Sequence, residues 1–95
     1  MKRIQIIEII RKIVLKNGIT KAYLFGSFAR KESKYSDIDL IIEPPKGFSL
    51  LDLSRVANSL EDLVGKNFDI VTFKGMNPKL KKIIKNEMVA VICFN

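Results

Sequence analysis

The 95-residue chain contains no histidine and only one cysteine, Cys93. Without histidine it cannot build a Ser-His triad, a Cys-His nucleophile, a histidine general base or an ordinary catalytic zinc site. Without a second cysteine it forms no internal disulfide, which fits a reducing cytoplasm. The apolar neighbours Val91, Ile92 and Phe94 predict that Cys93 is a buried structural thiol. Any catalysis must therefore use carboxylates, lysines, hydroxyls, backbone amides and a hard cation.

Acidic residues are also scarce, with 10 Asp and Glu against 17 Lys and Arg and a net charge of +7. A basic balance suits an anionic partner such as a nucleotide, a nucleic acid or an acidic protein, although a lysine-rich solvated surface has the same composition. Long apolar runs are missing as well. Glu8, Arg11 and Lys12 interrupt the apolar N-terminal segment, so it reads as neither a signal peptide nor a membrane span. We expect one cytoplasmic domain, residues 1–95, without membrane association.

Four helical segments alternate with four strand-like segments along the chain. Helices are predicted at residues 2–17, 27–31 and 49–65 and from Asn77 and Pro78 onward. Strands are predicted at residues 20–26, 38–43, 68–73 and 89–94. This order predicts an α/β (α+β) fold, a small mixed β-sheet flanked by helices.

Apolar residues at helical spacing indicate which helix faces are buried. In the segment 49–65, where Ser49 and Asp52 form a capping-box pattern, the expected core stripe is Leu53, Val56, Ala57, Leu60, Leu63 and Val64. In the helix from Pro78, the side chains expected inward are Leu80, Ile83 and Ile84, and those expected outward are Lys79, Lys81, Lys82 and Lys85. We interpret these lysines as a solvated helix side rather than a nucleic-acid-binding surface. The apolar residues of 2–17 cover well over half of the circumference of that helix. This predicts either that more of the helix surface is buried in the domain or that it contacts a protein partner.

Two aspartates, Asp37 and Asp39, stand at the start of one buried strand, and Asp69 lies in the next, FDIVTF. Side chains two residues apart on a strand point to the same face. Three carboxylates on one sheet surface repel one another unless a cation lies between them, and oxygen ligands without histidine or thiolate favour Mg²⁺ or Mn²⁺. An Asp-x-Asp pair can bridge two ions about 4 Å apart, the spacing of two-metal phosphoryl transfer. The alternative is that water or a lysine satisfies each acid separately.

Gly26 and Ser27 end a strand immediately before a short helix. A glycine lets the backbone approach a phosphate, whose charge the free amides of a helix start favour, and Ser27 adds a hydroxyl donor. Alone, such a turn is an ordinary helix cap; beside the acid pair it predicts a site for a polyphosphate and its metals. Arg30, one helical turn past Ser27, could reach a phosphate or equally serve as a surface salt-bridge partner.

The run LFGSFARKESKYSDIDLIIE, residues 24–43, resembles the signature of the DNA polymerase β-type nucleotidyltransferase superfamily. That signature is a hydrophobic residue, Gly-Ser, a spacer and Asp-h-Asp-h, where h is hydrophobic. With NFDIVTF and the ending NPKLKKIIKNEMVAVICF, the chain is similar to minimal nucleotidyltransferase (MNT) domains from about residue 20 onward, and the helix at 2–17 fits too. Two positions depart from the pattern. Phe28 stands where relatives often have a basic residue, which questions a phosphate contact there, and Lys31 stands where they often have glycine.

The resemblance implies a role for each site residue. Gly26 and Ser27 would bind the triphosphate, with Arg30 as a further candidate. Asp37 and Asp39 would hold two Mg²⁺ ions, and Asp69 would bind the catalytic metal and help to deprotonate the attacking hydroxyl. The reaction would transfer a nucleoside monophosphate, expected to be AMP from ATP, to that hydroxyl and release pyrophosphate.

The resemblance also implies a partner, because MNT domains commonly work with a HEPN-domain protein. MntA-like antitoxins AMPylate a tyrosine of a HEPN ribonuclease toxin, so we expect a type VII-like antitoxin, in a homo- or hetero-oligomer. One alternative is a non-catalytic module that neutralises the toxin by contact alone. Another is transfer to a small molecule such as an aminoglycoside, for which we can locate no acceptor pocket in so short a chain.

Overall fold

The computed structural model describes residues 1–93, and it confirms the predicted alternation of helices and strands. The helices are α1 (Arg3–Lys16), α2 (Gly26–Ala29), α3 (Leu50–Val64) and α4 (Pro78–Lys85). The strands are β1 (Lys21–Phe25), β2 (Asp37–Glu43), β3 (Asn67–Thr72) and β4 (Val89–Cys93). A 3₁₀ turn that was not predicted, η1 (Phe73–Gly75), links β3 to α4. The predictions for the Cys93 side chain and for Phe94 lie outside the described residues.

The four strands form one mixed sheet in the order β3-β2-β1-β4. Strand β1 pairs antiparallel with both β2 and β4, whereas β2 and β3 are parallel. A parallel pair needs a crossover connection, and α3 supplies it. The crossover brings two strand starts, those of β2 and β3, to the same end of the sheet.

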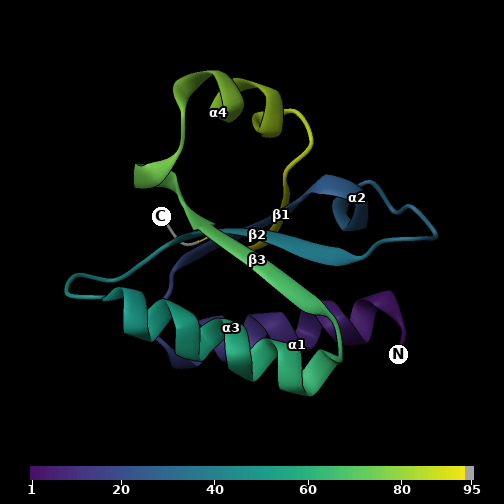
Figure 1. The fold of residues 1–95 in the computed structure, drawn as a ribbon, viewed down its shortest axis with the longest axis horizontal. Helices are drawn as coiled ribbons and strands as arrows, with labels where there is room; N and C mark the ends of the chain where they lie inside the picture. The colour runs from purple at the N-terminus through teal and green to yellow at the C-terminus, as the bar shows by residue number, and fades with distance from the viewer. Residues whose placement is uncertain (94–95) are drawn as a thin grey trace.

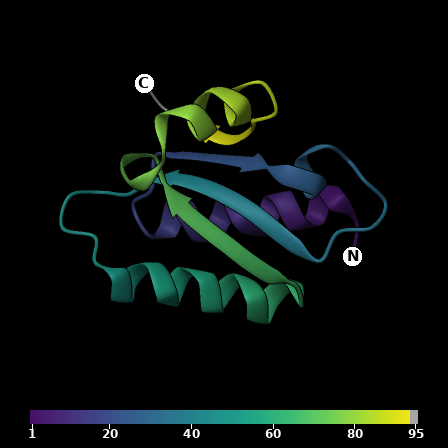
Figure 2. The ribbon, with the colours of Figure 1, turned by 45° about the horizontal axis from the view of Figure 1, so that its top comes forward.

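Helices α1 and α3 cover one face of the sheet, and α4 lies over the opposite one (Figures 1 and 2). Side chains alternate between these faces along each strand. On β2, Ile38, Leu40 and Ile42 belong to the core that α1 and α3 complete. Asp37, Asp39 and Ile41 therefore lie on the other side, which we call the open face.

The core on the α1–α3 side is wholly apolar, and the described residues include no buried polar or charged side chain. Helix α1 contributes Ile6, Ile10 and Val14, and α3 contributes Val56 and Leu60. Burying an aliphatic side chain of this size stabilises a fold by about 1.5–3 kcal/mol. This half of the molecule is therefore the rigid support on which the open face rests.

The cap of α3 was predicted correctly. The Ser49 hydroxyl accepts a hydrogen bond from the Asp52 backbone N–H at 3.1 Å, and the Asp52 carboxylate accepts one from the Ser49 N–H at 2.8 Å. The bond from the Ser49 N–H, and a second of 3.0 Å that the Ser49 hydroxyl donates to the same carboxylate, hold the pKa of Asp52 below its ordinary value. The reciprocal pair satisfies two backbone donors at the start of the crossover helix.

Three predicted core residues are instead exposed. Leu63 on α3 is 52% exposed, and on α4 Leu80 is 47% and Ile83 is 63% exposed. On α4 only Ile84 is buried, and the residues beside it at the sheet are Lys81, Lys85 and Met88. The spacing 81, 84, 85 and 88 is one helical face, so α4 turns a half-basic face to the sheet. The predictions that Leu80 and Ile83 face inward were wrong. Lys81 and Lys85 are exposed, as predicted, and they also line the hollow between α4 and the sheet.

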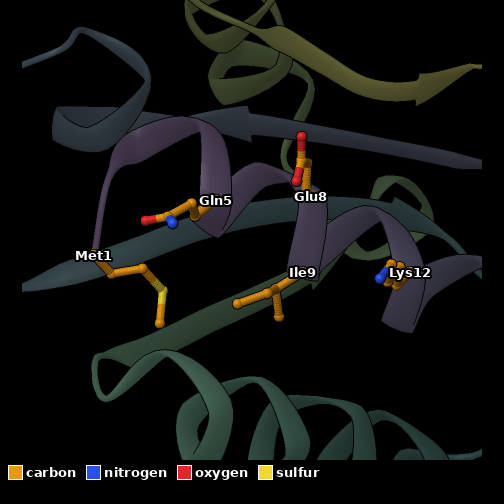
Figure 3. Close-up of a pocket in the computed structure, with 5 residues that line it drawn as sticks. All are labelled: Met1, Gln5, Glu8, Ile9 and Lys12. Carbon is orange, nitrogen blue, oxygen red and sulfur yellow. The ribbon is translucent and has the colours of Figure 1, made fainter.

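The broad apolar surface of α1 is only partly covered. Ile4 and Leu15 are exposed, while Ile7, Ile9 and Ile13 pack against the core. Figure 3 shows a shallow hollow along α1, where Met1 and Ile9 point towards α3 and Glu8 points away from it. Within residues 1–93, no helix combines the length and the apolar character needed to cross a membrane.

Candidate active site

Two predicted acids lie directly beside each other on the open face. The parallel register of β2 and β3 places Asp39 opposite Asp69, and Asp37 opposite Asn67. Because Asp37 is two residues before Asp39, it lies on the same face. A hydrogen bond of 2.9 Å from the Phe68 N–H to Glu61 Oε2 ties the start of β3 to α3 and so supports the position of Asp69. The fold thus gathers the three aspartates at one end of the sheet.

Asp39 is the least exposed of the three aspartates and lies close to the charges of the other two. It is half-buried, whereas Asp37 and Asp69 are exposed. Burial raises the pKa of Asp39 above its ordinary value, the negative charges of Asp69 and Asp37 raise it further, and the Arg30 guanidinium opposes the rise. The electrostatic environment of Asp39 therefore favours the arrival of a positive charge or the loss of a negative one.

Gly26 lies against the Asp39 carboxylate. The register pairs Phe25 with Asp39 across β1 and β2, and Gly26 follows with a left-handed φ of +74°. A Cβ added to Gly26 would stand 2.3 Å from Asp39 Oδ2, closer than any real contact. Only glycine fits both the backbone conformation and the space. The turn thus brings the Gly26 backbone beside Asp39. The phosphate-binding role of Gly26 and Ser27 stays a prediction.

Helix α2 ends in a Schellman motif with Lys31 at the left-handed position. The Glu32 N–H donates to the Ser27 carbonyl and the Lys31 N–H to the Phe28 carbonyl, both at 3.1 Å. Lys31 has φ +62°. Glycine adopts this conformation without strain, which gives a physical reason for the glycine that MNT-like sequences often have there.

Arg30 is engaged in ion pairs. Its guanidinium lies 2.6 Å from Glu32 and 3.1 Å from Glu87 (N···O), and these carboxylates raise its pKa. Of the two interpretations left open by the sequence, the salt-bridge role is the one observed in this structure. Sequence reasoning missed Glu87, because nothing local marks a partner 57 positions from Arg30.

Phe28 is a core residue rather than a phosphate contact. Its side chain is 1% exposed, and its ring packs edge-on against Tyr35 with centroids 4.9 Å apart. The Arg3 guanidinium lies 4.4 Å from the ring centroid, and it also donates to the Phe28 carbonyl. Where relatives often have a basic side chain, this chain has an aromatic ring covered by an arginine from α1.

The donor chemistry of the three aspartates fits Mg²⁺, which binds carboxylate oxygen. The raised pKa of Asp39 points the same way, because a cation would relieve the repulsion from Asp69 and Asp37. In the conformation seen, no three described His, Cys, Asp or Glu side chains are close enough together to hold an ion. Enclosing a metal would therefore require rotation of these side chains, which the exposure of Asp37 and Asp69 permits.

Comparison with known proteins identifies the family. The model of the nucleotidyltransferase domain family matches residues 5–91. The chain is 47% identical over 89 residues to "Putative protein adenylyltransferase MJ0435" of Methanocaldococcus jannaschii, covering 90% of this chain and 96% of that protein. A solved structure described as a putative minimal nucleotidyltransferase is 32% identical, with a TM-score of 0.77 and coverage of 87% of this chain and 86% of that one.

The fold also matches the structure of a tri-AMPylated Shewanella oneidensis HEPN toxin in complex with MNT antitoxin. The TM-score is 0.79 at 19% identity, over 98% of this chain and 74% of that one. At this identity the match establishes a common fold. With the family model and the acid-bearing sheet, it leads to one conclusion: the chain belongs to the nucleotidyltransferase domain family and has the minimal nucleotidyltransferase fold.

Proposed function

We propose that this nucleotidyltransferase is a magnesium-dependent protein adenylyltransferase, which transfers AMP from ATP to a tyrosine hydroxyl of a HEPN-domain toxin. The observation that carries the chemistry is the pairing of Asp39 with Asp69 beside Gly26. The 47% identity to a protein named an adenylyltransferase supports AMP transfer to a protein. The shared fold with a HEPN-bound antitoxin supports the partner.

The residues divide the work as follows. The Gly26–Ser27 backbone and the Ser27 hydroxyl hold the triphosphate, and Asp37, Asp39 and Asp69 hold Mg²⁺. Bound Mg²⁺ supplies positive charge against the α-phosphate and the leaving pyrophosphate.

In the transfer step, Asp69 accepts the proton of the tyrosine hydroxyl, whose oxygen forms a bond to the α-phosphorus. The bond from that phosphorus to the bridging oxygen breaks, and its electron pair leaves with pyrophosphate. A phosphate contact from Arg30 would compete with its two carboxylate partners.

The test is incubation of the purified chain with α-labelled ATP, Mg²⁺ and the protein encoded by the neighbouring gene, which the proposal expects to be a HEPN-domain protein. Label should appear on that protein, with a mass increase of AMP on tyrosine by mass spectrometry. The double variant Asp37→Asn/Asp39→Asn, or EDTA, should reduce the label to background. Asp62→Asn, an exposed acid on α3, is the matched control and should label normally.

The same double variant separates catalysis from simple binding. If it neutralises the toxin as well as the wild type does, neutralisation is by contact, and the enzymatic account is wrong. Absence of label on the HEPN protein but appearance on a small hydroxyl compound would assign the chain to the small-molecule alternative.

A further inference from the structure

A basic groove lies on the open face, over the second half of β2. Three cavities, with volumes of about 360, 280 and 670 Å³, adjoin one another here and share Phe73 and Lys81 in their walls. The first contains Ile41, two residues after Asp39 on the same face of β2, and the last reaches the loop at residues 44–48. We call this hollow the Phe73 groove. Its nearest approach to the acids is at Ile41, one same-face position along β2 from Asp39, and from there it runs towards the end of β2.

Lysines supply most of the charged side chains in the walls of the Phe73 groove. They are Lys21, Lys46, Lys74, Lys81 and Lys85, against the single acid Glu43. Glu43 is already paired with Lys21 at 3.5 Å. Across the described part of the chain, Lys46, Lys74 and Lys85 form no ion pair. The groove therefore presents uncompensated positive charge, which is complementary to an acidic ligand.

The apolar part of the groove favours a polypeptide over a nucleic acid. The Phe73 ring meets the Tyr23 ring edge-on, with centroids 5.7 Å apart and an angle of 81°. Lys81 Nζ lies 6.0 Å from the Phe73 centroid, over the ring. Single-stranded nucleic acids bind by stacking bases on open aromatic faces. Here a base would have to displace Lys81, whereas aliphatic and acidic side chains can pack beside Phe73 and Met88 as the groove stands.

We propose that the Phe73 groove docks an extended, acidic segment of the acceptor protein. The segment would place its hydroxyl-bearing residue at the Ile41 end, beside Asp39 and Asp69, and its acidic residues along Lys46, Lys74 and Lys85. The inference rests on the proposed protein-directed transfer, and it adds the acceptor's charge and its path across the molecule. It also assigns a function, binding of acidic side chains, to Lys81 and Lys85 of α4, which line the groove.

The probe is a fluorescein-labelled random copolymer of glutamate and tyrosine, titrated with the full chain without nucleotide or metal. The groove variant is Lys46→Glu/Lys74→Glu, and the matched control is Lys12→Glu/Lys16→Glu on α1, on the other side of the sheet. Both pairs change the net charge equally. The groove variant should lose at least about tenfold in affinity, and the control should stay within about twofold. Lys46→Gln/Lys74→Gln should lie between them, and circular dichroism checks that each variant folds.

Equal affinities of the groove and control variants would overturn the proposal, as would failure of the wild type to bind the copolymer. Tighter binding of an oligothymidylate than of the copolymer, lost in the groove variant, would overturn it in favour of a nucleic acid. Binding of Mg²⁺-ATP is measured separately by calorimetry. Because the copolymer assay contains no nucleotide, a failure of AMP transfer and a failure of docking give distinguishable results.

Discussion

At the scale of the residue, two positions show how the turn after β1 is built. Gly26 has no alternative, because its φ and its contact with Asp39 both exclude a side chain. Lys31 has the same kind of backbone without the same necessity, since its side chain is exposed and only its φ of +62° is unfavourable. A non-glycine residue in the left-handed region costs about 1–2 kcal/mol. The site therefore requires glycine at position 26, whereas having lysine instead of glycine at position 31 lowers the stability of the fold.

Replacing Lys31 with glycine should therefore stabilise the protein. Relief of the left-handed strain outweighs the extra entropy that glycine gives the unfolded chain, and the expected gain is about 0.5–1 kcal/mol. For a domain of this size, that gain raises Tm by a few degrees, measurable by scanning calorimetry. Lys34→Gly, in the same loop but without a left-handed φ, is the control and should not raise Tm. A Lys31→Gly protein with an unchanged or lower Tm would contradict the strain.

At the scale of the element, α4 shows where sequence reasoning reached its limit. The helix itself was predictable, because Asn77 caps it, Pro78 begins it, and apolar and basic residues alternate at helical spacing. Its orientation was not. An eight-residue helix with Leu80, Ile83 and Ile84 can bury either side, and only the position of the sheet selects Ile84. The same uncertainty did not affect β2, because Asp37 and Asp39 alternate with Ile38 and Leu40. Only one orientation of the strand buries the apolar pair and leaves the acids on the other face.

The neighbours Ile84 and Ile83 provide a matched test of that orientation. Ile84→Ala truncates the one buried side chain of α4. Truncations of this kind in a core lower the free energy of unfolding by about 2–5 kcal/mol. Ile83→Ala, at a 63% exposed position, should change stability by less than about 0.5 kcal/mol. Urea denaturation gives both values, and hydrogen exchange should locate the extra opening of Ile84→Ala in residues 78–88. Similar losses for the two variants would mean that α4 is turned differently.

At the scale of the whole molecule, the alternating elements and the gathering of three acids at one sheet end were both predictable. They follow from strand periodicity and from strands that start with acids. The Arg30–Glu87 pair and the direction of the Phe73 groove were not predictable, because they join segments that no local pattern relates. The roles of the acids in catalysis remain a prediction. What the fold does establish is that a stable apolar half supports a face that carries like charges close together.

Because Asp39 is partly buried beside two like charges, we expect Asp39→Asn to stabilise the metal-free protein. For an acid whose pKa is raised by folding, the stabilising contribution is present below its ordinary value of 3.8 and is lost as pH rises through the raised pKa. At neutral pH, ionised Asp39 therefore destabilises the fold through burial and the charges of Asp69 and Asp37. In EDTA, Asp39→Asn should melt at a higher temperature than the wild type, and the gap should close as pH falls towards 3.8.

The control for this experiment is Asp62→Asn on α3, which should change stability by less than about 0.5 kcal/mol. Equal or lower Tm for Asp39→Asn at neutral pH would show that Asp39 is not repelled in the folded state. The variant is expected to lose AMP transfer, so higher stability and lower activity should come from one substitution.

The parallel pairing of β2 and β3 sets the order in which the three aspartates come together as the chain folds. Gly26, Asp37 and Asp39 come together through the local β1–β2 pairing, which closes a short loop. Asp69 joins them only after the chain has passed through α3 and returned, a contact of long sequence separation. A growing chain on the ribosome therefore carries the turn and two acids before the third exists. For the mechanism we propose, chemical competence is therefore acquired late, with the folding of β3, because an unfinished chain carries Asp37 and Asp39 without Asp69.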